Sequence, residues 1–174
     1  MGEPVSLRPV EEADLALFSR FFTDPSAPGE FEWFGFRTTR AKEIDRRWHE
    51  DGLFSPEESF LAVALEDGSC AGWVNWRAQG TSGNYEIGIA LFPAHRGRGI
   101  GTEAQRQLVD YLFSHTTAHR LQAGTEVDNQ AEQRALEHAG FIREGVMRGV
   151  HFRDGQWRDG VVYGLLRDDW SGAP

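Results

Sequence analysis

The chain has 174 residues, which suits one domain with a substantial buried core, and it carries a net charge of −9. That acidic balance argues against nucleic acid or an anionic membrane as a partner, because either would need a contiguous basic surface. Cys70 is the one cysteine, so no intramolecular disulfide is available. With no apolar run of membrane-spanning length, we expect one cytoplasmic domain over residues 1–174.

Apolar periodicity and turn residues predict strands and helices along the whole chain. Helices are expected over 11–22, 39–49, 102–113 and 130–139, the second of them capped by Thr39. Strands are expected over 5–8, 59–65, 70–77, 85–91, 121–127, 146–152 and 160–166. Asp67-Gly68 and Asp154-Gly155 are typical of hairpin turns. This order predicts an α+β fold, in which a central mixed, mostly antiparallel sheet is flanked by helices.

A glycine-rich loop, Arg96-Gly97-Arg98-Gly99-Ile100-Gly101, follows the strand over 85–91 and leads into a helix. Its three glycines let backbone N–H groups converge on an anion, and the helix adds its positive N-terminal end. The alternative is a simple turn with solvated arginines. The loop is not a dinucleotide fingerprint, because Thr102 stands at the place of the third glycine, and it lacks the Gly-Lys-Ser/Thr of a nucleotide-triphosphate loop.

The spacing Arg96-x-x-Gly99-x-Gly101 after this strand resembles the pyrophosphate loop of the GNAT acetyltransferase superfamily. A second block, Asn129 followed by Arg134-Ala-Leu-Glu-His-Ala-Gly140-Phe141, is similar to the RimJ/RimL-type branch of that superfamily, as is the closing segment from Asp154 to Tyr163. The likeness covers nearly the whole chain and is strongest in its second half. It implies an acetyl-CoA-dependent N-acetyltransferase that uses no metal.

The resemblance also implies how acetyl-CoA is held. Backbone N–H groups along one stretch would bind its pyrophosphate: Arg96, Gly97, Arg98, Gly99, Ile100, Gly101 and Thr102. The strand from Ile89 to Leu91 would pair with the pantetheine arm, and the N–H of Leu91 would polarise the thioester carbonyl. Asn129 would contact pantetheine or the acceptor, and its alternative role is to cap the helix that follows it.

Glu86 is the expected base for the attacking amine, because the resemblance places a carboxylate there on the strand that carries the cofactor. A solvent-facing strand glutamate is the alternative, and His151 is the rival base. The two places where relatives carry an acid for the leaving thiolate hold Leu136 and Glu132 in place of tyrosine and serine. Tyr163 is then the candidate acid, and its alternatives are a core tyrosine and protonation by solvent.

The segment over 30–36 combines carboxylates with aromatic side chains, so we expect it to face a cationic acceptor, with Glu32 and Trp33 as selectivity residues. The alternatives are aromatic residues folded into the core and an acceptor bound near His151. The expected acceptor is a small-molecule amine or a peptide N-terminus. Two other functions stay open, a non-catalytic CoA-binding module and an acyltransferase for longer acyl-CoA. A homodimer is an open possibility for the assembly.

Overall fold

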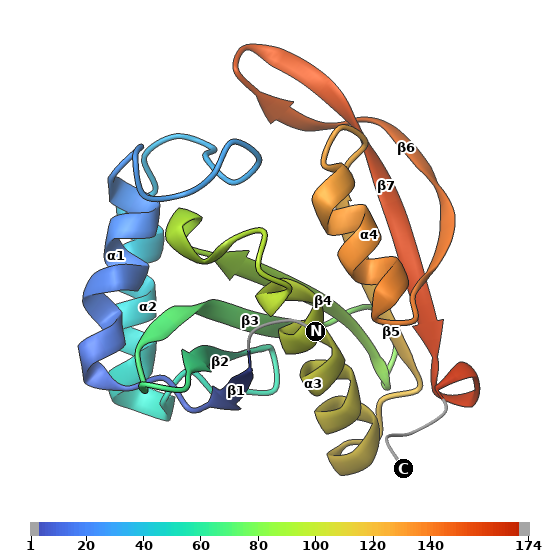
Figure 1. Cartoon of the computed structure of the whole chain (residues 1–174), viewed down its shortest axis with the longest axis horizontal. Helices are drawn as coiled ribbons and strands as arrows, with labels where there is room; N and C mark the ends of the chain where they lie inside the picture. Colours follow the sequence, from blue (N-terminus) through green and yellow to red (C-terminus); the bar gives the residue numbers. More distant parts are fainter. Residues whose placement is uncertain (1–3, 171–174) are drawn as a thin grey trace.

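The computed structural model describes residues 4–170 (Figure 1). Its α-helices and strands follow in chain order: β1 (Val5–Arg8), α1 (Leu15–Thr23), α2 (Thr38–Asp51), β2 (Glu58–Leu65), β3 (Cys70–Ala78), β4 (Asn84–Leu91), α3 (Ile100–His115), β5 (Arg120–Glu126), α4 (Gln130–His138), β6 (Ile142–Arg153) and β7 (Gln156–Leu166). No helix among the described residues is long and apolar enough to cross a membrane.

The strands form one seven-stranded sheet in the order β1-β2-β3-β4-β5-β7-β6. Every neighbouring pair is antiparallel except β4 and β5, which run parallel. The expected α+β fold with a mixed, mostly antiparallel sheet is therefore confirmed. The parallel pair is the important one for function, because it joins the two halves of the sheet at its centre.

Strand β2 shows how the sheet acquires a core on each face. Its side chains alternate, so Phe60 and Ala62 pack beneath α1 and α2, whereas Leu61 and Val63 pack beneath α3. Figure 1 shows α1 and α2 together on one side of these strands, with α3 on the other. On the α1 side the rings of Trp73 and Phe18 stack with their centroids 4.3 Å apart. A strand buried on both faces explains the unbroken apolar run of β2.

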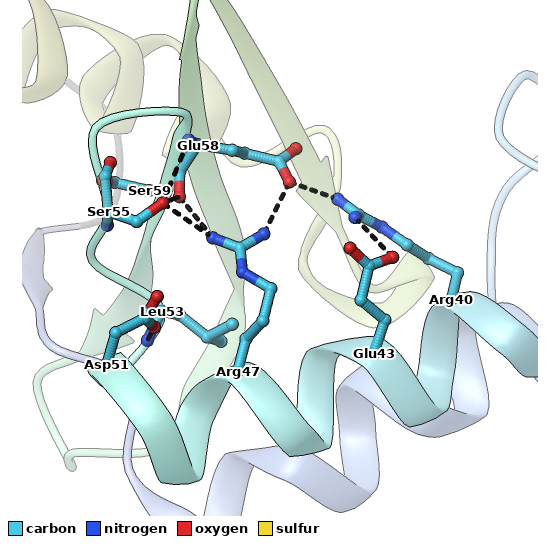
Figure 2. A network of polar contacts seen from close by, with 8 residues as sticks. All are labelled: Arg40, Glu43, Arg47, Asp51, Leu53, Ser55, Glu58 and Ser59. Carbon is cyan, nitrogen blue, oxygen red and sulfur yellow. Dashed lines mark hydrogen bonds and ion pairs between the residues drawn. The ribbon is translucent and has the colours of Figure 1, made fainter.

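A network of ion pairs attaches α2 to the start of β2 (Figure 2). Arg40 Nη2 and Arg47 Nη1 donate to the same carboxylate oxygen of Glu58, at 2.6 and 2.9 Å. Arg47 Nη2 also donates to the backbone carbonyl of Glu58 at 2.5 Å, and Ser55 Oγ donates to that carbonyl at 3.2 Å. The side chains of Arg47 and Glu58 are 11% and 17% exposed, so both charges depend on this pairing.

Glu58→Ala should therefore lower the free energy of unfolding by about 1–3 kcal/mol, because Arg47 loses its carboxylate partner and Arg40 is left with Glu43 alone. Glu50→Ala is the matched control on α2: its pair with Arg46 has side chains 59% and 56% exposed, and its loss should cost less than about 0.5 kcal/mol. Urea denaturation of both variants measures the difference. Equal losses would mean that the network adds no stability of its own.

Most predicted element boundaries are shifted by one or two residues, such as the start of α3 at Ile100, and three differences matter more. The predicted start of the first helix is a short 3-10 helix, Glu12–Asp14, and α1 begins at Leu15. The predicted cap at Thr39 is wrong, because α2 already begins at Thr38 with Arg37 at its N-cap. The closing hairpin is longer than expected, since β6 begins at Ile142 and β7 at Gln156. Its turn was predicted correctly, with Asp154 and Gly155 at φ of 53° and 75°.

Candidate active site

The site lies where β4 and β5 separate. These strands pair over only three rungs, the last of which joins Glu86 to Gln122, and then diverge. A cavity of about 600 Å³ occupies the space beyond this rung. Its walls come from the two strands, the glycine-rich loop, the first turns of α3 and α4, the segment before α2 and the closing hairpin.

The cavity brings together most of the residues that the sequence predicted for the site. Those that line it are Ile89, Leu91, Arg96, Gly97, Gly99, Gly101, Thr102, Asn129, Glu32 and His151. Five predicted residues lie outside its lining: Glu86, Tyr163, Arg98, Ile100 and Trp33.

The glycine-rich loop has the backbone shape that its composition predicted. Gly97 and Gly99 have φ of 71° and 78°, a region that residues with a Cβ rarely enter. Gly99 is also the N-cap of α3, so the first N–H groups of a sixteen-residue helix point out of the loop. Gly101 follows on the cavity wall, where a Cβ would point toward the side chains of Leu91 and Ile89. The loop therefore presents N–H groups and a positive helix end to the cavity.

Strand β4 supplies unpaired backbone groups to the same cavity. Phe92 N donates to Ala71 O at 3.0 Å, which makes these two residues a hydrogen-bonded pair of the β3–β4 ladder. Because such pairs alternate, the backbone groups of Leu91 and Ile89 point away from β3 and toward the split. On the side of β4 that faces β5, no strand among the described residues pairs with it beyond Glu86. An extended ligand can occupy the vacant ladder positions.

Arg96 binds protein groups and does not point into the loop. Its Nε donates to the carbonyl of Leu91 at 2.8 Å, and its Nη2 donates to the same carbonyl and to the carboxylate of Glu32. Gly29 makes room for it, because a Cβ at that position would lie 1.4 Å from Arg96 Nη1. Arg96 thus ties the segment before α2 to the end of β4, which fixes one wall of the cavity.

Asn129 fills one of the two roles that the sequence left open, the cap of α4. Its Oδ1 accepts from the backbone N–H of Glu132 at 3.3 Å, as a cap of α4, and its Nδ2 donates to Thr125 Oγ1 at 3.0 Å. The capping role is confirmed. The side chain also lines the cavity, so the contact with a ligand remains a prediction.

Three glutamates on the cavity wall have different electrostatic environments. Glu126 forms a buried two-pronged pair with Arg153 at 2.8 and 2.9 Å, which lowers its pKa. Burial raises the pKa of Glu32, and the charge of Arg96 partly offsets this. Burial also raises the pKa of Glu132, to about 8, against a single hydrogen bond from Gln105 Nε2 at 2.7 Å.

The candidate base and acid of the sequence analysis occupy other places. Glu86 lies on the rung before the split, where Arg77 Nη2 and Gln79 Nε2 donate to its carboxylate at 2.6 and 2.5 Å. Tyr163 is fully buried beneath α4, and its hydroxyl donates to Glu137 Oε1 at 3.1 Å. The structure brings neither side chain to the cavity wall.

His151, the rival base, does line the cavity, and its Nε2 is buried without a hydrogen-bond partner among the described residues. In the segment before α2, the aromatic residues on the wall are Phe31 and Phe34, while Trp33 packs edge-on against Phe36 with ring centroids 5.3 Å apart.

The lining residues that the sequence did not assign to the site include Gln105, Glu126 and Glu132. Gln105 lies at a core-facing position of α3, and Glu126 lies at the end of a strand, where a charge usually meets solvent. Only Glu132 left a signal, because a glutamate replaces the serine of the RimJ/RimL-type pattern.

Curated relatives share this chain's sequence to different extents. It is 43% identical over 83 residues to the "Probable N-acetyltransferase YjcK" of Bacillus subtilis, an alignment that spans about half of either protein, 48% of this chain and 46% of the relative. It is 26% identical to the prophage-derived uncharacterized N-acetyltransferase YokL of the same organism, over 98% of this chain and 94% of the relative. It is 28% identical to the [ribosomal protein uS5]-alanine N-acetyltransferase of Escherichia coli, over 69% of this chain and 58% of the relative.

Solved structures share its fold. The spermidine N-acetyltransferase of Vibrio cholerae in complex with CoA and spermine superposes with a TM-score of 0.77 at 20% identity, covering 95% of this chain and 96% of that one. RimJ of Mycobacterium smegmatis in complex with CoA-disulfide gives a TM-score of 0.78 at 22% identity, over 98% and 86%. The family model described as the acetyltransferase (GNAT) domain matches residues 5–142. The chain thus belongs to the GNAT family of acetyltransferases.

Proposed function

We propose that the protein transfers an acetyl group directly from acetyl-CoA to a primary amine, which belongs to a small cationic molecule or to a peptide N-terminus. The observation that carries this is the split between β4 and β5, with N–H groups at one end and unpaired strand backbone along one side. Holding both reactants in one cavity makes the transfer effectively unimolecular. We also propose that the protein belongs to the RimJ/RimL-type branch and acts in the cytoplasm.

The chain's own groups fit acetyl-CoA along the length of the cavity. The loop from Gly97 to Thr102 offers N–H groups and the end of α3 to a pyrophosphate, whereas the N–H of Arg96 donates to Pro93 O at 3.3 Å. The free backbone groups of Ile89 offer hydrogen bonds to the amides of pantetheine, whereas the carbonyl of Leu91 is already bonded to Arg96 and only its N–H is free. The N–H of Leu91 then stabilises the negative charge that develops on the thioester oxygen. Gln105 adds a buried Oε1 that has no partner among the described residues and accepts a further bond.

The acceptor side of the cavity favours a cation. Glu30, Glu32, Glu126 and Glu132 line the cavity, and the aromatic ring of Phe31 lies beside them. Glu30 is exposed to solvent, so it can attract a cationic amine, while Glu32 is paired with Arg96. The Vibrio cholerae structure with spermine and the Escherichia coli relative that acts on a protein alanine support the two proposed acceptor classes.

A screen of acetyl-CoA consumption tests the proposal, with polyamines, other small amines and peptides of varied N-termini as acceptors. We expect turnover with at least one primary amine and a product one acetyl group heavier. Tight CoA binding without turnover on any amine would mark a non-catalytic module. Faster turnover with a longer acyl-CoA would mean that the longer acyl group, and not acetyl, is the one transferred.

The two candidate bases make opposite predictions. His151 lines the cavity and Glu86 does not, so His151→Gln should lower kcat about 10- to 100-fold and Glu86→Gln should change it by less than about threefold. Steady-state kinetics at pH 7 with the acceptor from the screen gives both values. The reverse order would return the role of base to Glu86, and no loss in either variant would assign the proton to solvent.

A further inference from the structure

Glu132 is the cavity carboxyl whose environment differs from all the others. We propose that Glu132, in its carboxylic acid form, protonates the CoA thiolate as it leaves. This role rests on the proposed acetyl transfer. The residue lies in the first turn of α4, directly after the cap Asn129, and its carboxyl faces Gln105 of α3 across the cavity wall. It lines the cavity together with the glycine-rich loop and the end of β5.

The other carboxyl groups of the cavity are either ion-paired or exposed to solvent. Glu32 is paired with Arg96 and Glu126 with Arg153, so both are held as carboxylates. Glu30 lines the cavity and is exposed to solvent. Among the described residues Glu132 has no ion pair, and an amide from Gln105 is its hydrogen-bond partner. Glu132 is therefore the cavity carboxyl that has neither an ion pair nor an exposed position to stabilise its charge.

Three neighbouring features keep this carboxyl protonated. Protein atoms surround it and withdraw it from water, and the charge of Glu32 across the cavity adds repulsion. Arg96, which also lines the cavity, is occupied by Glu32 and by the carbonyl of Leu91. Burial, with the repulsion from Glu32, raises the pKa of Glu132 to about 8, close to the value of about 8.5 typical of a thiol. A proton transfer between matched groups needs little driving force.

The amine nitrogen attacks the thioester carbon, the new C–N bond forms, and the C–S bond breaks with its electron pair remaining on sulfur. Glu132 gives its proton to that sulfur, which leaves as the thiol. The surplus proton of the attacking nitrogen passes to the base or to solvent, and Glu132 regains a proton from water. The net products are the N-acetyl amine and CoA thiol, with the enzyme unchanged.

Glu132→Gln tests the role, because glutamine keeps the size and the contact with Gln105 but has no proton to transfer. We expect kcat at pH 7 to fall about 100-fold with acetyl-CoA and a saturating amine from the screen, while calorimetry shows acetyl-CoA affinity within about threefold of wild type. The control is Glu137→Gln on the same helix, whose carboxylate bonds Tyr163 outside the cavity and which should keep wild-type kcat.

The pH profile separates an acid from a merely structural residue. In the wild type kcat should decline above about pH 8 as Glu132 loses its proton, and this decline should be absent in Glu132→Gln. A wild-type kcat that rises through pH 8 and becomes flat in the variant would overturn the proposal, because it would make Glu132 the base. Wild-type kcat in Glu132→Gln would overturn it as well.

Infrared difference spectra supply a readout that needs no acceptor. Between pH 6 and pH 10 the wild type and Glu137→Gln should lose the carbonyl stretch of one protonated carboxyl, and Glu132→Gln should not. If that band is missing from the wild type, Glu132 is not protonated and the proposed role as acid is wrong, whatever the activity. If the band is present but no amine is acetylated by the wild type, the proposed function itself fails and takes the catalytic role with it.

Discussion

Gly99→Glu should abolish acetyl-CoA binding, with a loss of affinity of at least about 100-fold. Gly99 has φ of 78° and is the N-cap of α3. A side chain there strains the backbone by about 1–2 kcal/mol, and a carboxylate occupies the anion position at the helix end and repels the pyrophosphate. Titration calorimetry of the folded variant with acetyl-CoA measures the loss.

Two further variants separate the causes of that loss. Gly99→Ala adds the backbone strain without the charge, so it should lose less affinity than Gly99→Glu. Gly68→Glu is the matched control, because Gly68 has φ of 82°, has open space around its Cβ direction and lies in the turn between β2 and β3. It should keep full affinity despite the same strain and charge. Unchanged binding in a folded Gly99→Glu would remove the loop from the cofactor site.

Local patterns predicted the elements whose cause is local. The positive φ values at Asp154 and Gly155 follow from a turn chemistry that two adjacent residues determine. The apolar run of β2 predicts a strand buried on both faces, and α1 and α3 cover those faces. The lengths of β6 and β7 were underestimated because the pairing of one strand extends the other. That mutual support is absent from either sequence taken alone.

The site was predictable only as far as the backbone. The glycines and the β4 strand indicated where a cofactor would lie, because their effect is on main-chain geometry. The side-chain roles depend on where β4 and β5 separate, and no local pattern encodes that position. Glu86 falls on the last paired rung, directly opposite Arg77, which explains its ion pair. Tyr163 stands opposite Ala123 on β5, under α4, which places it in the core.

Glu132 is a residue whose proposed role the sequence did not indicate. Its sequence signal was a departure from a family pattern, and departures do not indicate a role. Its environment comes from Gln105, Glu32 and Arg96, which lie 27, 100 and 36 positions away in the chain and meet it only in the folded protein. A buried acid without a cation as partner is a cost to stability, and such costs are common at functional sites.

Glu132→Gln should therefore make the protein more stable, increasingly so as pH rises. Burial places the folded-state pKa of Glu132 at about 8, above the unfolded value of 4.5. Between these two values the folded state holds a proton that the unfolded state has released, so each step up in pH lowers the free energy of unfolding. The penalty is absent below the unfolded pKa, grows through this window and is constant above the folded pKa.

The full shift corresponds to an upper bound of about 5 kcal/mol, and a side chain that keeps one face toward the cavity should show a few kcal/mol of it. Urea denaturation of wild type and Glu132→Gln from pH 5 to pH 9 measures the difference, which should be near zero at pH 5 and largest above pH 8. Glu137→Gln, from an exposed position on the same helix, should run parallel to wild type throughout. Parallel curves for Glu132→Gln would mean that Glu132 is ionised in the folded protein. The proton proposed for the leaving thiolate would then have to come from another group.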